Sequence, residues 1–186
     1  MKNISIKDTT EFNKPEQYIL SILICKDGFC YTLFNKIEKK FEALVSENIE
    51  ISEKLKDCFY DFVKRNKLDS FNDVKIVIAE KKSTIVPEAF FEVDAVENIY
   101  NLNFFNEIDT KILYSKLEKS GNYIIFSVDQ QLLQIINSLF AKYKIYSQSH
   151  SFIENHFVAN KLSENPKSSK IYVQVFGDFF DVLVLD

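Results

Sequence analysis

This sequence of 186 residues has no tryptophan, and it contains only three glycines, three prolines, three cysteines and two histidines. The few cysteines exclude a disulfide scaffold, and Cys25, Cys30 and Cys58 lack the spacing of zinc ligands. The few glycines and prolines predict that loops are scarce or are built from Asn, Asp, Ser and Lys. No apolar run reaches about 18 residues. We therefore expect a soluble, cytoplasmic protein without membrane insertion.

Arginine is almost absent as well, because Arg65 is the only one among 23 basic residues. Proteins that bind nucleic acid or phosphate rely on arginine for bidentate contacts, and the formal charge is −4. Lysine-rich stretches such as Lys36–Lys40 are typical of a solvated surface. The composition therefore predicts no nucleic-acid partner.

Large apolar side chains are abundant, since the chain has 18 phenylalanines and nine tyrosines. Hydrophobic residues make up 46% of the sequence. This supply predicts a substantial buried core and argues against disorder.

The first part of the chain predicts a hairpin, a helix and a further strand. Residues 18–25 and 29–35 are rich in strand-forming residues, and Asp27-Gly28 between them favours a two-residue turn. Residues 39–46 can add a third strand. The apolar spacing over 51–68 predicts an amphipathic helix capped by Ser52. A right-handed crossover through this helix places strand 74–79 parallel to the first strand.

The rest of the chain alternates strands and helices. Pro87 ends strand 83–86, and helical turns and loop are expected from 87 to 106. Asp129 is a good N-cap for a helix that runs to about Tyr143. The remaining elements are expected as a hairpin of 111–117 and 122–128, strand 144–149, helix 150–162, a polar linker over 163–169, and a closing hairpin of 171–176 and 179–185.

This order predicts an α/β fold of the ribonuclease-H-like type, with a mixed sheet and flanking helices. The opening and closing hairpins share a β-rich run, an Asp/Gly turn followed by Phe, and a second β-rich run. We therefore expect two similar halves, as in actin-like ATPases, with the second half truncated. The predicted organisation is a loose arm over 1–16, a first half over 17–165 with an insertion around 83–128, and the opening hairpin of a second half over 170–186.

Four segments carry a family resemblance: Ser83-Thr-Ile-Val-Pro-Glu-Ala-Phe-Phe91, Lys111–Leu117, Tyr146-Ser-Gln-Ser-His150 and Val173–Asp181. Together they resemble the domain-of-unknown-function family 3822, which occurs in Bacteroidetes-type bacteria. The resemblance covers nearly the whole chain. It implies a degenerate actin-like ATPase fold with two ribonuclease-H-like halves, and it implies no particular activity.

Actin-like ATPases hold phosphates with two hairpins, which carry small residues and carboxylates for ATP and magnesium. The residues here that match those motifs are Asp27 and Gly28 in the first hairpin, and Gly177, Asp178 and Asp181 in the second. Bulky Phe29, Phe176, Phe179 and Phe180 replace small or hydroxyl residues, and we expect their rings to fill the space that a phosphate needs. The sequence therefore favours plain structural hairpins over a nucleotide site.

Other catalytic patterns are missing. A ribonuclease-H-type nuclease needs a carboxylate within its first strand, and residues 18–25 contain none. Glu80 follows strand 74–79 and is interpreted as a solvated strand end. The six-residue spacing of His150 and His156 does not suit a helical metal pair, and His150 is expected to bond locally. We predict neither a metal site nor catalytic residues.

Cys25 and Cys30 flank the first turn. With Asp27-Gly28 as the two turn residues, Lys26 faces Phe29 and Cys25 faces Cys30 in a non-hydrogen-bonded pair. The two thiols are then expected on one face of the sheet, adjacent and reduced, with a redox pair as the alternative.

These observations favour a non-catalytic interaction or scaffold protein that keeps an actin-like fold for an unidentified protein partner, with homodimerisation possible. The alternative is a divergent nucleotide-binding protein that uses ATP with magnesium. The open, apolar edge of the closing hairpin also predicts self-association.

Overall fold

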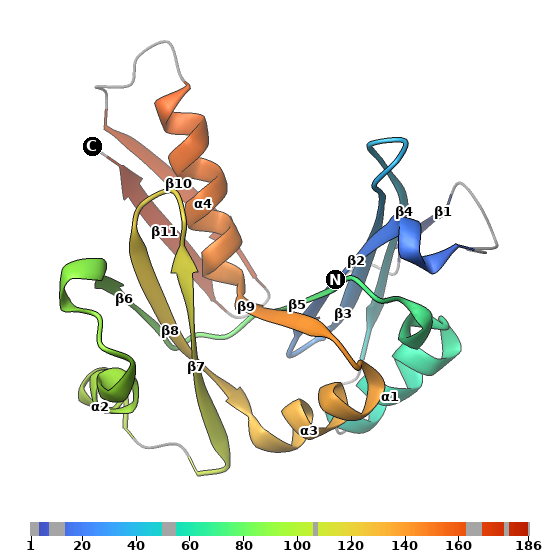
Figure 1. The fold of residues 1–186 in the computed structure, drawn as a ribbon, viewed down its shortest axis with the longest axis horizontal. Helices are drawn as coiled ribbons and strands as arrows, with labels where there is room; N and C mark the ends of the chain where they lie inside the picture. Colours follow the sequence, from blue (N-terminus) through green and yellow to red (C-terminus); the bar gives the residue numbers. More distant parts are fainter. Residues whose placement is uncertain are drawn as a thin grey trace. The chain divides into compact units, whose positions relative to one another are not determined.

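The computed structural model describes residues 4–7, 14–49, 55–105, 108–162, 169–176 and 179–185. The chain forms two compact units. The first unit contains residues 1–79 and 129–145, and the second contains residues 80–128 and 146–186. Figure 1 shows the elements of both units.

The first unit is built on a six-stranded mixed sheet. Its strand order is β1-β4-β3-β2-β5-β9, and the strands span Ile4–Lys7 (β1), Lys40–Asn48 (β4), Gly28–Asn35 (β3), Tyr18–Cys25 (β2), Val74–Ile78 (β5) and Tyr143–Ser147 (β9). The predicted parallel pairing of the first strand with Val74–Ile78 is confirmed. Residues 4–7, which fall within the expected loose arm, pair with β4.

Helices cover one face of this sheet. They are α1 (Leu55–Arg65) and α3 (Gln130–Leu139), which pack against each other, with short 3-10 turns at Pro15–Gln17 and Leu68–Ser70. Asp129 caps α3 as predicted, because its carboxylate accepts a hydrogen bond from the Leu132 amide at 2.8 Å. The predicted Ser52 cap of α1 lies outside the described residues.

The first hairpin has a different register from the predicted one. Its turn residues are Lys26 and Asp27, so Cys25 pairs with Gly28 and Cys30 pairs with Leu23. The predicted facing pair of Cys25 and Cys30 is therefore wrong, although both lie on the same face as diagonal neighbours. The physical reason is the third strand: a β-carbon on Gly28 would lie 2.3 Å from the Glu47 carbonyl oxygen of β4, so this glycine is needed within the sheet.

The second unit combines two small sheets with two helices. Strands β6 (Ser83–Pro87), β8 (Asn122–Asp129) and β7 (Thr110–Leu117) form a sheet in the order β6-β8-β7, and β10 (Lys170–Val175) pairs with β11 (Phe180–Leu185). Short turns Glu88–Phe90 and Val93–Ala95 lead into α2 (Val96–Asn103). Helix α4 (Gln148–Lys161) packs against β7, β10 and β11, and in Figure 1 it runs alongside the hairpin.

Two apolar clusters hold this unit together. Val86, Val96, Tyr100 and Ile125 join the sheet to α2. Leu117, Ile124 and Ile153 join β7 and β8 to α4, with Leu183 of β11 packed against them. The strand-rich insertion expected around 83–128 is thus a three-stranded sheet with its own helix. The prediction that the closing hairpin begins a second half stays a prediction.

Candidate functional site

A cluster of hydrogen-bonded polar side chains lies at the start of α4 in the second unit. The Gln148 amide is its centre: its Oε1 accepts a hydrogen bond from the Glu80 backbone N–H at 3.0 Å. Its Nε2 donates to the Glu80 carbonyl at 3.0 Å and to Asp181 Oδ2 at 3.1 Å. Gln148 is only 3% exposed. One side chain therefore connects two segments that are far apart in the sequence.

Two serines complete this polar cluster. Ser147 Oγ donates to Glu80 Oε1 at 3.0 Å, and Ser149 Oγ donates to Asp181 Oδ2 at 3.1 Å. Ser147 also caps α4, because its hydroxyl accepts from the Ser149 amide at 3.2 Å. Helix α4 therefore begins at Gln148, two residues before the predicted start. Glu80, interpreted from sequence as a solvated strand end, is part of this network.

Asp181 reaches the cluster because side chains alternate along β11. Asp181 and Leu183 point toward α4, whereas Val182 between them points away from it. Both hydrogen-bond donors to this carboxylate from the described residues, Gln148 Nε2 and Ser149 Oγ, bond to Oδ2. Within the described part of the chain, Asp181 makes no ion pair and Oδ1 accepts no hydrogen bond.

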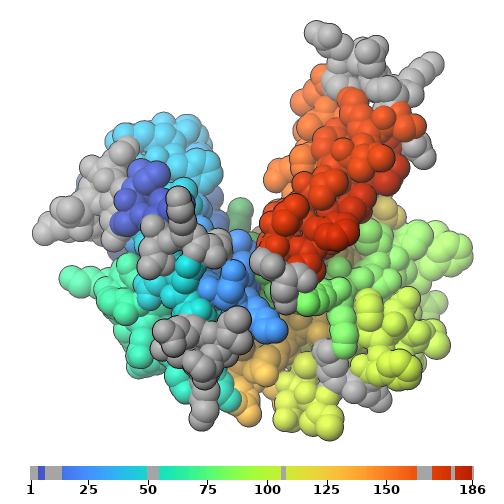
Figure 2. All heavy atoms as spheres, turned by 180° about the vertical axis from the view of Figure 1, so that it is seen from behind, coloured from blue at the N-terminus to red at the C-terminus, as the bar shows by residue number. Residues whose placement is uncertain are grey.

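A groove of about 290 Å³ adjoins Asp181, and we call it the β6–β11 groove. Figure 2 shows the red spheres of β11 beside the green spheres of β6. The residues that line the groove come from β6, β8, α4 and β11. They are Ser83, Thr84, Ile85, Ile124, Ser149, Phe152, Ile153, Asp181, Val182 and Leu183. The groove thus combines an aliphatic and aromatic surface with three hydroxyls and one carboxylate.

The first hairpin holds two of the sequence-predicted nucleotide residues, Asp27 and Gly28. The Asp27 carbonyl accepts a hydrogen bond from the Ile49 amide at 3.1 Å, and Gly28 is packed against Glu47. Phe29 was expected to fill the space of a phosphate, and this is wrong. It is fully buried between the sheet and α1, with its ring centroid 5.4 Å from Phe59 and 5.2 Å from Phe62. Both Gly28 and Phe29 therefore have structural roles in the packing of the first unit.

The second hairpin carries the other predicted nucleotide residues. Gly177 and Asp178 lie outside the described residues, and Asp181 belongs to the polar cluster. On either side of the turn, the rings of Phe176 and Phe179 stack with centroids 4.6 Å apart. The Phe176 amide also donates to the Phe179 carbonyl at 2.8 Å. Two large rings therefore lie where a phosphate loop carries small residues.

The cysteine and histidine predictions concern single side chains outside the polar cluster. Cys25 and Cys30 form no disulfide, and burial raises the pKa of the Cys30 thiol, which disfavours the reactive thiolate. His150 bonds locally as predicted, with Nδ1 2.9 Å from Ser115 Oγ. Burial lowers the pKa of this imidazole, against the opposing charges of Glu154 and Glu118. Among the described residues, no group of His, Cys, Asp and Glu side chains is arranged to hold a metal ion.

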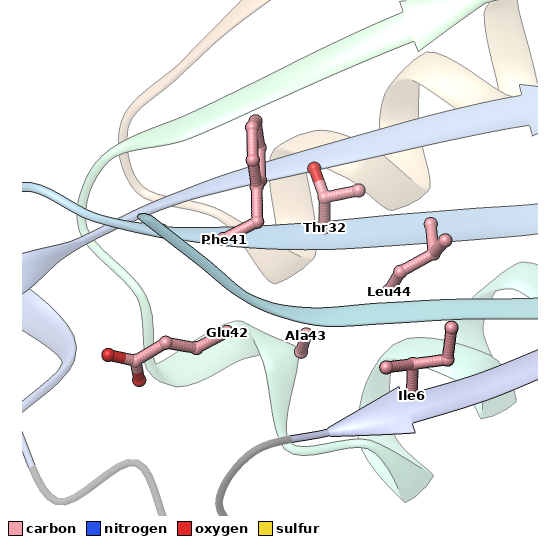
Figure 3. Close-up of a pocket in the computed structure, with 6 residues that line it drawn as sticks. All are labelled: Ile6, Thr32, Phe41, Glu42, Ala43 and Leu44. Carbon is pink, nitrogen blue, oxygen red and sulfur yellow. The ribbon is translucent and has the colours of Figure 1, made fainter. Parts of the chain in front are cut away.

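A second, apolar hollow of about 350 Å³ lies on the sheet of the first unit. Figure 3 shows Ile6, Thr32, Phe41 and Leu44 pointing to one side of this sheet, while Ala43 and Glu42 point to the other. Glu42 and Ala43 are successive residues and still share a side of the sheet. The reason is a β-bulge between the pairs Leu33–Ala43 and Phe34–Phe41, which leaves Glu42 as the extra residue.

The bulge places the Glu42 carboxylate in a buried position. Glu42 is 6% exposed, and its two oxygens accept hydrogen bonds from Tyr18 Oη and Asn35 Nδ2, each at 2.8 Å. The hydrogen bonds from Tyr18 and Asn35 hold the pKa of this carboxyl below its ordinary value, although its burial opposes them. Sequence reasoning did not identify Glu42 or Gln148 as the centre of a polar cluster, because their hydrogen-bonding partners come from other segments of the chain.

The profile of the family described as "Protein of unknown function (DUF3822)" matches residues 7–186. The chain belongs to this family. No curated protein matches this DUF3822 chain. Among the described residues, no helix has the length and apolar character needed to span a membrane.

A solved structure supports the fold of this DUF3822 protein. It is a protein from Bacteroides thetaiotaomicron VPI-5482, solved at 1.85 Å and described as having an actin-like ATPase fold and unknown function. The sequences are 27% identical, the TM-score is 0.88, and the match covers 96% of this chain and 69% of that chain. The predicted fold class, a mixed α/β fold of the actin-like ATPase type, is confirmed.

Proposed function

We propose that this DUF3822 chain is a non-catalytic module that uses an actin-like fold to bind another protein. One observation carries the proposal: an apolar face of the β10–β11 hairpin is open to solvent. We call it the outer hairpin face. Its six side chains are 52–76% exposed, and they are Ile171, Val173, Val175, Phe180, Val182 and Val184.

The register makes these six side chains one continuous surface. Ile171 pairs with Val184, Val173 with Val182, and Val175 with Phe180. The alternate residues of both strands point toward α4 and contribute to the core of the second unit. Contiguous exposed apolar surface of this kind is typical of protein interaction sites.

Three features support a non-catalytic role. Gly28 is used to fit against Glu47, Phe176 and Phe179 stack beside the second turn, and Asp181 accepts two hydrogen bonds from neutral side chains. The alternative, a divergent ATP-binding protein, is favoured by the carboxylate of Asp181 beside Gln148. In that alternative, Asp27, Gly28, Gly177, Asp178 and Asp181 serve ATP and magnesium.

The outer hairpin face is tested with the double substitution Ile171→Ser/Val184→Ser, which replaces one directly opposed pair. A matched control, Val93→Ser/Leu102→Ser, changes two other exposed apolar residues of the second unit, which are 59% and 86% exposed. We expect the wild-type protein and the control to form a complex, with a second copy or with a partner isolated from native cells, and the hairpin variant to lose it. Sedimentation velocity measures the fraction of each protein that is in the complex. Equal association of all three proteins overturns the proposal.

Calorimetry and thermal unfolding with magnesium and ATP test the alternative. A ligand at about 100 times its dissociation constant stabilises the native state by about 2.7 kcal/mol. We expect no shift in the unfolding temperature. A clear shift that Asp181→Ala abolishes would establish the nucleotide-binding alternative instead.

A further inference from the structure

We propose that the β6–β11 groove binds an extended polypeptide segment of a partner, and that a lysine of this segment pairs with Asp181. This proposal deepens the interaction function, on which it rests, by naming the chemistry of a partner segment. It concerns a surface that shares only Val182 with the outer hairpin face. Three properties of the groove support it: two strand edges, an acidic side chain that pairs with no cation among the described residues, and an apolar surface.

The walls of the groove are the edges of two different sheets. Strand β6 is the outermost strand of the order β6-β8-β7, and β11 pairs with β10 alone. The outer edge of such a strand presents backbone N–H and C=O groups that an added strand can pair with. An extended peptide uses such edges for affinity, and its alternate side chains enter pockets for specificity. Ser83, Thr84 and Ile85 of β6 line the groove together with Asp181, Val182 and Leu183 of β11.

Asp181 gives this groove its charge preference. In the described residues, both donors to its carboxylate are neutral and both bond to Oδ2, which leaves Oδ1 without a donor. The nearby Lys81 ammonium lies over the Phe179 ring, 5.8 Å from its centroid, and makes no ion pair with Asp181. A partly buried carboxylate without a cation is costly to desolvate. A lysine ammonium, whose three donors have no fixed plane, suits the single open oxygen.

The apolar part of the groove determines which residues we expect beside that lysine in the partner segment. Ile124, Phe152 and Ile153 form an apolar surface, and the volume of about 290 Å³ has room for side chains of a bound peptide. Side chains on one face of a strand lie two residues apart. A peptide antiparallel to β11 that places lysine opposite Asp181 therefore places an aliphatic residue opposite Leu183. The predicted recognition pattern is an aliphatic residue, any residue, and then lysine.

The probe is the labelled peptide acetyl-Val-Thr-Ile-Thr-Lys-Thr-amide, and its binding is measured by fluorescence anisotropy. We expect saturable binding to the wild-type protein and to the control Asp57→Asn, which removes an exposed carboxylate of α1. Asp181→Asn keeps the shape of the side chain and should weaken binding by at least about tenfold, as expected for loss of a charge-assisted hydrogen bond. A peptide with glutamate in place of lysine should not bind.

A second variant and a second measurement locate the peptide. Thr84→Lys brings an ammonium into the groove from β6 and should abolish binding without changing any residue of the outer hairpin face. Hydrogen exchange should show new protection of amides in β6 or β11 when the peptide is bound. Equal affinity of Asp181→Asn and wild type, absence of peptide binding to both, or protection confined to other strands overturns the groove proposal. The association lost in Ile171→Ser/Val184→Ser, which changes no groove residue, tests the interaction function separately.

Discussion

The buried carboxylate of Glu42 allows a quantitative test of the first unit. Tyr18 and Asn35 donate the two hydrogen bonds to it. Glu42 is 6% exposed, Tyr18 is 8% exposed and Asn35 is 5% exposed. Tyr18→Phe removes one donor without removing the ring, which packs edge-to-face on Phe71 at 6.1 Å. A hydrogen bond to a charged group contributes about 1.5–3 kcal/mol. We expect Tyr18→Phe to lower the free energy of unfolding by about 1–3 kcal/mol.

The pH dependence of this effect has a definite sign. The pKa of Glu42 is lower in the folded protein than its unfolded value of about 4.3. Its contribution is therefore fully present above that value and is lost as pH falls through the lower folded-state pKa. We expect the difference in stability between wild type and Glu42→Gln to be largest near neutral pH and to shrink in acid.

Urea unfolding at several pH values measures both effects, and the double variant Tyr18→Phe/Glu42→Gln supplies their coupling energy. The control is Tyr60→Phe, an exposed tyrosine of α1 that should change stability by less than about 0.5 kcal/mol. If Tyr18→Phe costs no more than this control, or if its cost is the same at pH 3 and pH 7, the assigned role of the Glu42 cluster is refuted.

Three further predictions concern other sites. Gly28→Ala should lower stability by about 1–3 kcal/mol, because its β-carbon would lie 2.3 Å from the Glu47 carbonyl oxygen. Thermal unfolding measures this loss, and an unfolding temperature equal to that of the wild type contradicts the proposed packing. Asp129→Ala should cost about 1 kcal/mol through loss of the α3 cap, and Asp129→Asn should restore most of it in the same unfolding assay. The His150 imidazole should titrate below about 6.5 by NMR because burial disfavours its charged form, and a higher value would contradict that burial.

Much of the fold could be predicted from local patterns. The alternation over β2 and β3, the apolar spacing of α1 and the Asp129 cap are properties of neighbouring residues, so they are readable from the sequence. The parallel pairing of β2 with β5 followed from the handedness of a crossover connection. The family resemblance supplied the fold type, which the profile match and the solved structure confirm.

Tertiary structure decided the register and the site. The turn lies at Lys26-Asp27 and not at the predicted Asp27-Gly28, because Gly28 fits closely against β4. This contact is with residues about twenty positions away in the sequence. A bulge in β4 turned Glu42 toward Tyr18 and Asn35. Gln148 joined Glu80 to Asp181 across separations of 68 and 33 residues. Local sequence determines which residues can form a strand or a helix, but only packing of the whole chain determines which polar groups meet.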